Sequence, residues 1–280
     1  MATEARDFGT TERDVRPIAE MECAVVGHAW VNDSYRHLIA DAPDGALAAR
    51  PGQFFHILCP TEGADSPFLR RPMSVYRVDR EARRIEFLYK VAGAGTRTLS
   101  GLEVGQALNV FGPLGHGFSP GQGTRHVVIV ARGVGLSTLA PLVEDAVGRG
   151  IAATAILSAR SSDYVMSDDY LRDVGASVET VTDSDGTSAV ERVEDRVRRL
   201  IAADGADYVA TCGSNRLLFM LRRVCAELGI AGEVAMEQRM GCGLGMCFCC
   251  VSPFRVAGEV VYRRICCDGP VFDIQQAMAW

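Results

Sequence analysis

The sequence lacks the features that define several large classes of protein. Its 280 residues contain no long apolar run, so no segment is expected to span a membrane. It has no long run of Lys and Arg, and its 35 acidic residues outnumber 29 basic ones, which argues against nucleic acid as a partner. No internal repeat or low-complexity segment is visible. With 48% hydrophobic and 23% charged residues, the composition predicts a folded chain of about two domains.

The first 19 residues lack the apolar core of a secretory signal. They mix acidic, basic, Gly and Pro residues, so we expect a flexible N-terminal segment and a cytoplasmic protein. The chain has ten cysteines. Cytosolic thiols are usually reduced, so an intracellular chain rich in cysteine more often uses them as metal ligands than as disulfides.

The spacing of apolar residues changes along the chain and divides it into two parts. Residues 20–122 contain short strand-like runs at Glu22–Val26, Gln53–Cys59, Ser74–Val78 and Arg84–Lys90. Turn residues separate these runs, a pattern that predicts an antiparallel β-barrel. Residues 119–124 are the candidate linker to the next domain.

Strands and helices alternate over residues 123–236, which predicts an α/β domain with a parallel sheet. The expected strands are His126–Ala131, Ala152–Leu157, Ser177–Thr182, Tyr208–Thr211 and Glu233–Met236. The expected helices are Leu136–Val147, Ser167–Asp173, Ala189–Ala203 and Arg216–Leu228.

Six of the ten cysteines fall in the last 39 residues, and we expect residues 237–280 to form a separate small module. Cys242, Cys247 and Cys250 have the spacing C-x4-C-x2-C, and Cys266 follows after fifteen residues. This is the plant-type spacing of iron–sulfur ligands, so the sequence predicts a 2Fe–2S cluster.

Other uses of the cysteines remain open at this stage. Cys249 and Cys267 each adjoin a proposed ligand, and either one is an alternative ligand. A structural zinc site is the competing interpretation, although zinc sites favour paired C-x2-C knuckles. Cys212 and Cys225 are expected to be buried as small hydrophobic residues.

Several short motifs precede the cysteines in a fixed order. They are Arg-Pro-Met-Ser at residues 71–74, Leu-Tyr-Lys at 88–90, Gly-Thr at 95–96 and GPLGHGF at 112–118. Each motif alone is weak. Together with the cysteines they closely resemble the electron-transfer subunits of type 1B dihydroorotate dehydrogenase, a family of the ferredoxin reductase superfamily.

The resemblance implies an FAD-binding barrel, a nucleotide-binding α/β domain and a C-terminal 2Fe–2S module. The residues it assigns to FAD are Arg71, Pro72, Met73, Ser74, Leu88, Tyr89, Lys90, Gly95 and Thr96. Arg71 would reach the phosphates, which suits its planar fork of donors. The family's closing motif C-x-D-G-P-V-F matches residues 266–272 and favours Cys266 over Cys267 as the fourth ligand.

The nicotinamide site departs further from the family pattern. Gly133 and Gly135 precede a helix and are expected to bind the pyrophosphate of a nicotinamide nucleotide. The family usually has a proline almost directly after these glycines, whereas here the first proline is Pro141. Cys212 and Gly213 resemble the superfamily's C-G stretch near the nicotinamide. Residues 158–160 end in an Arg that would favour NADP, and the choice between NAD and NADP stays open.

The expected function is therefore electron transfer between NAD(P)(H), FAD and a 2Fe–2S cluster. No paired acid and base residues, and no nucleophile constellation, are apparent for an organic substrate. The resemblance places that chemistry in a partner, an FMN subunit that oxidises dihydroorotate. The alternatives are a reductase subunit that feeds another flavin or iron–sulfur oxidoreductase, and a non-enzymatic redox sensor or zinc-stabilised module.

Overall fold

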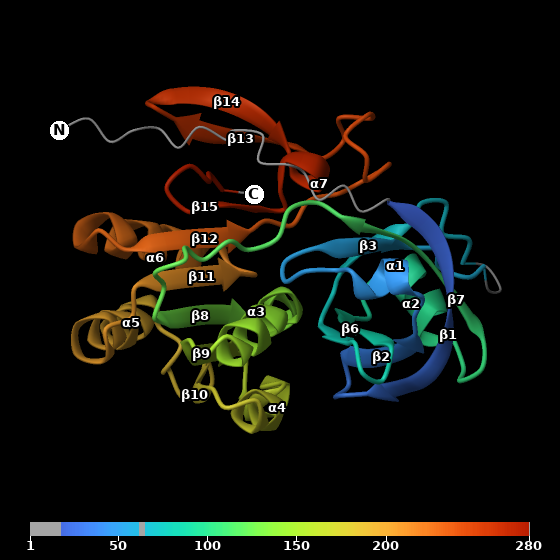
Figure 1. The fold of residues 1–280 in the computed structure, drawn as a ribbon, viewed down its shortest axis with the longest axis horizontal. Coiled ribbons are helices and arrows are strands. Elements are labelled where there is room, and N and C mark those ends of the chain that lie inside the picture. The colour runs from blue at the N-terminus through green and yellow to red at the C-terminus, as the bar shows by residue number, and fades with distance from the viewer. Residues whose placement is uncertain (1–17, 62–64, 280) are drawn as a thin grey trace.

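Two sheets and a C-terminal hairpin make up residues 18–61 and 65–279, which the computed structural model describes (Figure 1). The flexible segment expected over residues 1–19 lies almost wholly outside the described residues. The expected fold class, an antiparallel barrel followed by an α/β domain and a small C-terminal region, is confirmed.

The first sheet has seven antiparallel strands in the order β4-β3-β7-β1-β2-β6-β5. The strands are β1 (Ala19–Trp30), β2 (Tyr35–Asp41), β3 (Phe54–Ile57), β4 (Arg71–Ser74), β5 (Arg77–Asp79), β6 (Arg84–Lys90) and β7 (Ala107–Leu114). Two short helices, α1 (Asp44–Leu47) and α2 (Ala94–Ser100), accompany them. Side chains such as Leu38, Phe55 and Phe87 alternate into one buried core, as expected of strands with one face turned inward.

The expected strand Ser74–Val78 is wrong as one element, because the chain changes partner within it. Up to Ser74 the backbone pairs with β3, and Val75 N–H still donates to Gln53 O at 3.1 Å. The next amide, Tyr76 N–H, donates to Glu86 O of β6 at 2.9 Å. The apolar residues are thus buried both before and after the chain changes its strand partner.

The second sheet has the strand order β10-β9-β8-β11-β12-β15, and all its neighbours are parallel except β12 and β15. Its strands are β8 (His126–Arg132), β9 (Ala152–Ala159), β10 (Ser177–Thr182), β11 (Tyr208–Cys212), β12 (Ala231–Ala235) and β15 (Val271–Asp273). Its helices are α3 (Leu136–Gly148), α4 (Asp168–Asp173), α5 (Val190–Asp204) and α6 (Asn215–Leu228), with 3-10 turns η1 (Gly133–Gly135) and η2 (Ser162–Tyr164).

Helices cover both faces of this sheet, which explains the continuous apolar run in β8. Val128 and Val130 share a core with α5 and α6, whereas Val127 and Ile129 share one with α3 and α4. Figure 1 shows α3 on the side of the sheet that faces the barrel. The core on that side also contains Leu88 of β6, so α3 and the barrel pack together.

The C-terminal region begins with the hairpin β13 (Val251–Val256) and β14 (Glu259–Arg264), followed by the short helix α7 (Ile265–Asp268). The chain then re-enters the second sheet as β15, where Phe272 pairs with Val234 of β12. The expected boundaries at 20–122, 123–236 and 237–280 stay predictions. The return of β15 means that the last segment and the α/β domain share a sheet.

Two motifs from distant parts of the sequence meet beside the barrel. His116 N–H donates to Gly269 O at 2.6 Å, which joins GPLGHGF to the C-terminal Asp-Gly-Pro-Val-Phe. This contact holds the C-terminal region against the barrel. In the described part of the chain, no helix is both long and apolar enough to cross a membrane.

Candidate functional site

The predicted nucleotide residues lie at the carboxyl edge of the parallel sheet. The turns after β8 and β11 touch there, because a Cβ placed on Gly135 would lie 2.5 Å from Cys212 O. A Cβ on Gly213 would meet Arg132 O and would lie 3.4 Å from the Cα of Gly135. Only glycine permits this approach at both positions, so the fold brings Gly133, Gly135, Cys212 and Gly213 together.

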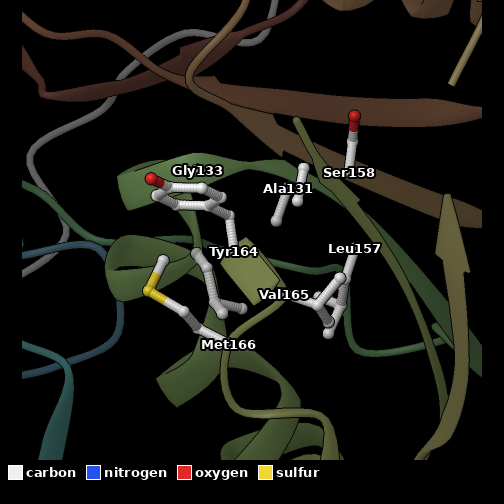
Figure 2. Close-up of a pocket in the computed structure, with 9 residues that line it drawn as sticks. Ala131, Gly133, Leu157, Ser158, Tyr164, Val165 and Met166 are labelled. Atoms are coloured by element: carbon white, nitrogen blue, oxygen red, sulfur yellow. The ribbon is translucent and has the colours of Figure 1, made fainter. Parts of the chain in front are cut away.

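A pocket opens at the same edge (Figure 2). It is lined by Ala131, Gly133, Leu136, Leu157, Ser158, Ala159, Tyr164, Val165 and Met166. Ligands of open α/β sheets bind outside the carboxyl ends of the strands, which is where this pocket lies. Tyr164 and Met166 come from the segment between β9 and α4, and no motif in the sequence pointed to them.

Arg132 at the end of β8 is held by acceptors on β9 and directly after β10. Its guanidinium donates to the Asp183 carboxylate at 2.7 and 3.1 Å and to Ser158 Oγ at 2.9 Å. These hydrogen bonds from Arg132, with a further one from Ser188, lower the pKa of Asp183 to about 2. Arg160, the cation that would favour NADP, stacks over the Tyr164 ring at 4.9 Å. An ionised carboxylate paired with Arg132 therefore stands beside the predicted nucleotide site.

The predicted flavin residues come together on β4 and α2. All four residues of β4 are half-buried, and a Cβ on Gly95 would lie 2.7 Å from Nε of Arg71. Thr96 Oγ1 accepts hydrogen bonds from the amides of Ala92 and Gly93 at 2.8 and 3.1 Å. The start of α2 is thus ordered directly beneath the Arg71 guanidinium, an arrangement suited to a phosphate.

The three residues at 88–90 do not share one role. Tyr89 is buried in the barrel core, and its hydroxyl is 2.9 Å from His28 Nε2. Burial raises the pKa of this phenol well above its usual value. Leu88 faces α3 and Lys90 is exposed. Alternation along β6 therefore separates side chains that the sequence motif groups together.

A polar cluster joins the flavin strand to the nucleotide domain. Thr138 Oγ1 of α3 donates to Ser74 Oγ at 2.7 Å. The Cys212 thiol lies 3.9 Å from Thr138 Oγ1 and 4.0 Å from Glu237 Oε1. Burial raises the pKa of Cys212, and Cys225 is buried as well, in agreement with the expectation for both. Thr138 and Glu237 were not identified in the sequence, because neither belongs to a motif there.

The cysteine loop brings Cys242 and Cys247 into contact. Burial alone would raise the pKa of Cys242, but hydrogen bonds from the amides of Cys247, Leu244 and Met246 and with the Cys247 thiol lower it to about 7. The Leu244 amide donates to Cys242 Sγ at 3.3 Å. Gly243 and Gly245 have φ of 71° and 76°, a conformation that turns the loop tightly around the sulfur.

Cys250 and Cys266 form the second pair. Both are buried, and their Sγ atoms are 3.2 Å apart. Cys267 lies beside the Asp268 carboxylate, with Sγ 3.7 Å from Oδ1, and Cys249 is exposed. Across residues 18–61 and 65–279, no three His, Cys, Asp or Glu side chains converge as a metal site. The four predicted ligands thus occur as two pairs.

The donor set at this loop nevertheless suits a 2Fe–2S cluster. It offers four thiols, which are the ligands of such a centre, and backbone amides directed at the sulfur of Cys242, which would tune its potential. Arg264 connects α7 to the cysteine loop, because its guanidinium donates to Asp268 at 2.9 Å and to Gly245 O at 3.3 Å. The loop and α7 are thereby held together.

Comparison with known proteins supports this assignment. Residues 237–277 match the model of the iron–sulfur cluster binding domain of dihydroorotate dehydrogenase B. The electron transfer subunit of dihydroorotate dehydrogenase B (NAD(+)) from Desulforamulus reducens is 33% identical over 239 residues, which are 85% of this chain and 90% of that protein. The subunit of the same name from a Geobacillus species is 35% identical over 226 residues, 79% of this chain and 84% of that one.

Solved structures show the same architecture. An NADH-dependent reduced ferredoxin-NADP oxidoreductase has a TM-score of 0.76 and 25% identity, covering 91% of this chain and 88% of its own. The ferredoxin-NADP+ reductase of Plasmodium falciparum has a TM-score of 0.59 and 11% identity, covering 74% of this chain and 89% of its own. The second likeness concerns the fold alone.

Proposed function

Because the chain belongs to the family of dihydroorotate dehydrogenase B electron transfer subunits, we propose that it carries electrons between NAD(H) and a separate catalytic subunit. In this proposal the partner oxidises dihydroorotate to orotate with a bound FMN, a step of pyrimidine biosynthesis. The chain holds FAD and a 2Fe–2S cluster, in agreement with the matched cluster-binding domain. Cysteine ligands need reduced thiols, and we place the protein in the cytoplasm.

One observation carries the proposal: the three predicted cofactor sites adjoin one another. Ser74 of the flavin strand accepts a hydrogen bond from Thr138, the residue beside Cys212 in the nucleotide domain. On the other side, His56 pairs with Pro72 of the flavin strand and its ring touches Gly243 of the cysteine loop. The flavin strand thus lies between the other two sites.

When bound, flavin trades electrons in pairs with a nicotinamide and singly with an iron–sulfur centre. The residues that bind and orient these groups are those described above. Arg71, with Gly95 and Thr96 at the start of α2, provides the donors for phosphate. Ser74 and Cys212 lie at the junction where α3 packs against the barrel.

We assign the cluster to Cys242, Cys247, Cys250 and Cys266. The contact between Cys250 and Cys266 supports the fourth ligand, because their sulfurs are 3.2 Å apart. Cys267 lies instead beside the Asp268 carboxylate, and the family's closing motif places Cys266, not Cys267, at the ligand position. Cys249 is exposed and falls outside the C-x4-C-x2-C spacing, so it is the best candidate for a cysteine outside the cluster.

We assign NAD rather than NADP as the nucleotide. The relatives are named for NAD(+), and the Arg132 guanidinium is already engaged by Asp183. The Asp183 carboxylate would repel the 2′-phosphate of NADP, whereas it can accept a hydrogen bond from a ribose hydroxyl. Arg160 is turned toward Tyr164 and Asp33 rather than left free.

The decisive experiment is anaerobic purification of the chain together with its native partner. We expect a coloured complex with equimolar FAD, two irons and two sulfides for each copy of this chain, and NAD reduction when dihydroorotate is added. A colourless chain without flavin or iron would contradict the proposal. A loaded complex that oxidises NADH but ignores dihydroorotate would point instead to a reductase subunit of another oxidoreductase.

A further inference from the structure

His56 of β3 is a buried side chain whose polar end has no partner. The residue is 1% exposed, and its Nε2 has no hydrogen-bond partner among the residues that the structure describes. Buried polar groups in folded proteins are nearly always paired, so an orphaned nitrogen calls for an explanation, such as a group that the polypeptide alone does not contain.

The ring of His56 faces the cysteine loop. A Cβ placed on Gly243 would lie 3.1 Å from Cε1 and 3.2 Å from Nε2 of His56. Gly243 directly follows Cys242, whose sulfur also accepts the amide of Leu244 at 3.3 Å. The unpaired Nε2 edge therefore lies against the segment that carries the first cluster ligand.

The backbone of His56 lies against the flavin strand. His56 pairs with Pro72 of β4, between Arg71 and Met73. Its carbonyl accepts a hydrogen bond from Arg70 at 3.2 Å, and its ring lies 5.8 Å from that of Phe54. These contacts fix the position of the imidazole between the two predicted redox sites.

The imidazole is a neutral group. Burial, with a smaller effect of Arg70, lowers the pKa of His56 to about 4. A neutral imidazole carries one N–H donor and one acceptor nitrogen. In the tautomer that carries the proton on Nε2, the ring presents an N–H donor to the cysteine loop and adds no charge there.

We propose that His56 Nε2–H donates a hydrogen bond to a sulfur atom of the cysteine loop when the 2Fe–2S cluster is bound, and so raises the reduction potential of the cluster. This inference rests on the proposed function. One-electron reduction places an additional negative charge at the sulfurs, and a directed N–H stabilises the reduced form more than the oxidised form. His56 acts here as a potential-setting residue and not as a ligand.

The test is a redox titration of the loaded complex, followed by visible absorbance and electron paramagnetic resonance, for wild type, His56→Leu and His56→Gln. Leu removes the donor at similar size, whereas the Gln amide retains one. We expect His56→Leu to lower the midpoint potential by about 59 mV, a tenfold change in the one-electron equilibrium constant. His56→Gln should remain nearer to wild type, with full iron, sulfide and FAD in both variants.

His126→Leu is the matched control, since His126 is also buried but its Nε2 is already paired with Thr154 at 2.9 Å in the second sheet. Its potential should equal that of the wild type. A fully loaded His56→Leu variant with the wild-type potential would overturn the inference while leaving the proposed function intact.

A second measurement decides the matter should His56→Leu fail to assemble. In wild-type protein labelled with 15N-histidine, the reduced centre should show a hyperfine coupling to a histidine nitrogen. The coupling should persist in His116→Asn, which removes the histidine of the neighbouring GPLGHGF motif, and disappear in His56→Gln. Absence of any histidine coupling in the wild type would refute the hydrogen bond.

Discussion

At the scale of single residues, the nucleotide site is governed by the pair formed by Arg132 and Asp183. Two hydrogen bonds join the guanidinium to the carboxylate, and a third reaches Ser158 on the strand between them. The carboxylate stays ionised at neutral pH because the hydrogen bonds from Arg132 and Ser188 lower its pKa to about 2. An ionised carboxylate that already occupies the Arg132 guanidinium is thereby held at the edge of the predicted nucleotide site.

We predict that Asp183→Asn shifts the nucleotide preference toward NADPH. The substitution removes the repelling charge and frees Arg132 for the phosphate, and a charge-assisted contact at this partly exposed position is worth about 1.5 kcal/mol. The ratio of NADPH to NADH in rates of flavin reduction, measured anaerobically by stopped flow, should rise about tenfold.

Asp185→Asn is the control for this change. Its carboxylate lies two residues away and accepts hydrogen bonds from Thr187 within its own turn, and it pairs with no arginine within residues 18–61 and 65–279. Its nucleotide preference should remain that of the wild type. An unchanged ratio in Asp183→Asn would remove Asp183 from the specificity site.

Some residues of the site could be predicted from the sequence and others could not. The spacing of Cys242, Cys247 and Cys250 predicted a cluster loop because those ligands lie on one short segment. Thr138, Glu237 and His56 gave no such signal. Each belongs to the site only through contact with a segment far away in the chain, as with Thr138 and Ser74, which are 64 residues apart.

At the scale of elements, the turn between β8 and α3 is the most tightly constrained part of the nucleotide site. It rests on the turn after β11, where Cys212 O occupies the space that a side chain on Gly135 would need. The two turns are therefore packed against each other, and a side chain on Gly135 would push them apart.

We predict that Gly135→Ala weakens NADH binding and lowers the free energy of unfolding by about 1–3 kcal/mol, because the added methyl group would be forced against backbone. Urea unfolding and NADH titration measure the two effects. Gly148→Ala, at the other end of α3, meets no atom within 4 Å and should leave NADH binding unchanged while stabilising the helix slightly. Equal behaviour of the two variants would contradict this account of the turn.

Most elements followed from local pattern. β6 and β10 have the predicted bounds, because each is an apolar strand ended by turn residues. The prediction failed at residues 74–78, where an apolar run crosses from one strand partner to another. The hairpin of β13 and β14, which fills the interval between Cys250 and Cys266, was not predicted.

At the scale of the whole molecule, the C-terminal region is built into the rest of the protein. One buried core contains Phe54 and Leu114 of the barrel, Val234 of the parallel sheet, and both Cys250 and Cys266. β15 then closes the sheet beside β12. The cysteine pair that we assign to the cluster is therefore continuous with the core of the α/β domain.

We predict that Cys250→Ser loses iron and sulfide but keeps FAD, and that amides of both β12 and β15 exchange faster with deuterium. Loss of the cluster removes the bonds that hold α7, and β15 follows α7 directly. Hydrogen exchange with mass spectrometry measures the second effect.

Cys249→Ser provides the comparison, because its side chain is exposed and is not assigned as a ligand. It should retain both the metal content and the slow exchange. A Cys250→Ser variant with full iron and sulfide would exclude Cys250 as a ligand. Faster exchange in β15 without a change in β12 would show that loss of the cluster does not destabilise the rest of the sheet.

Patterns within short segments were enough to predict the barrel, the alternating strands and helices, the family and the candidate cofactor residues. Such patterns depend on burial, turn chemistry and ligand spacing, all of which act over a few neighbouring residues. The folded chain alone placed Thr138 on Ser74, His56 on the cysteine loop and β15 in the parallel sheet. These contacts arise when whole elements pack together, and no periodicity in the sequence encodes which distant side chains will then meet.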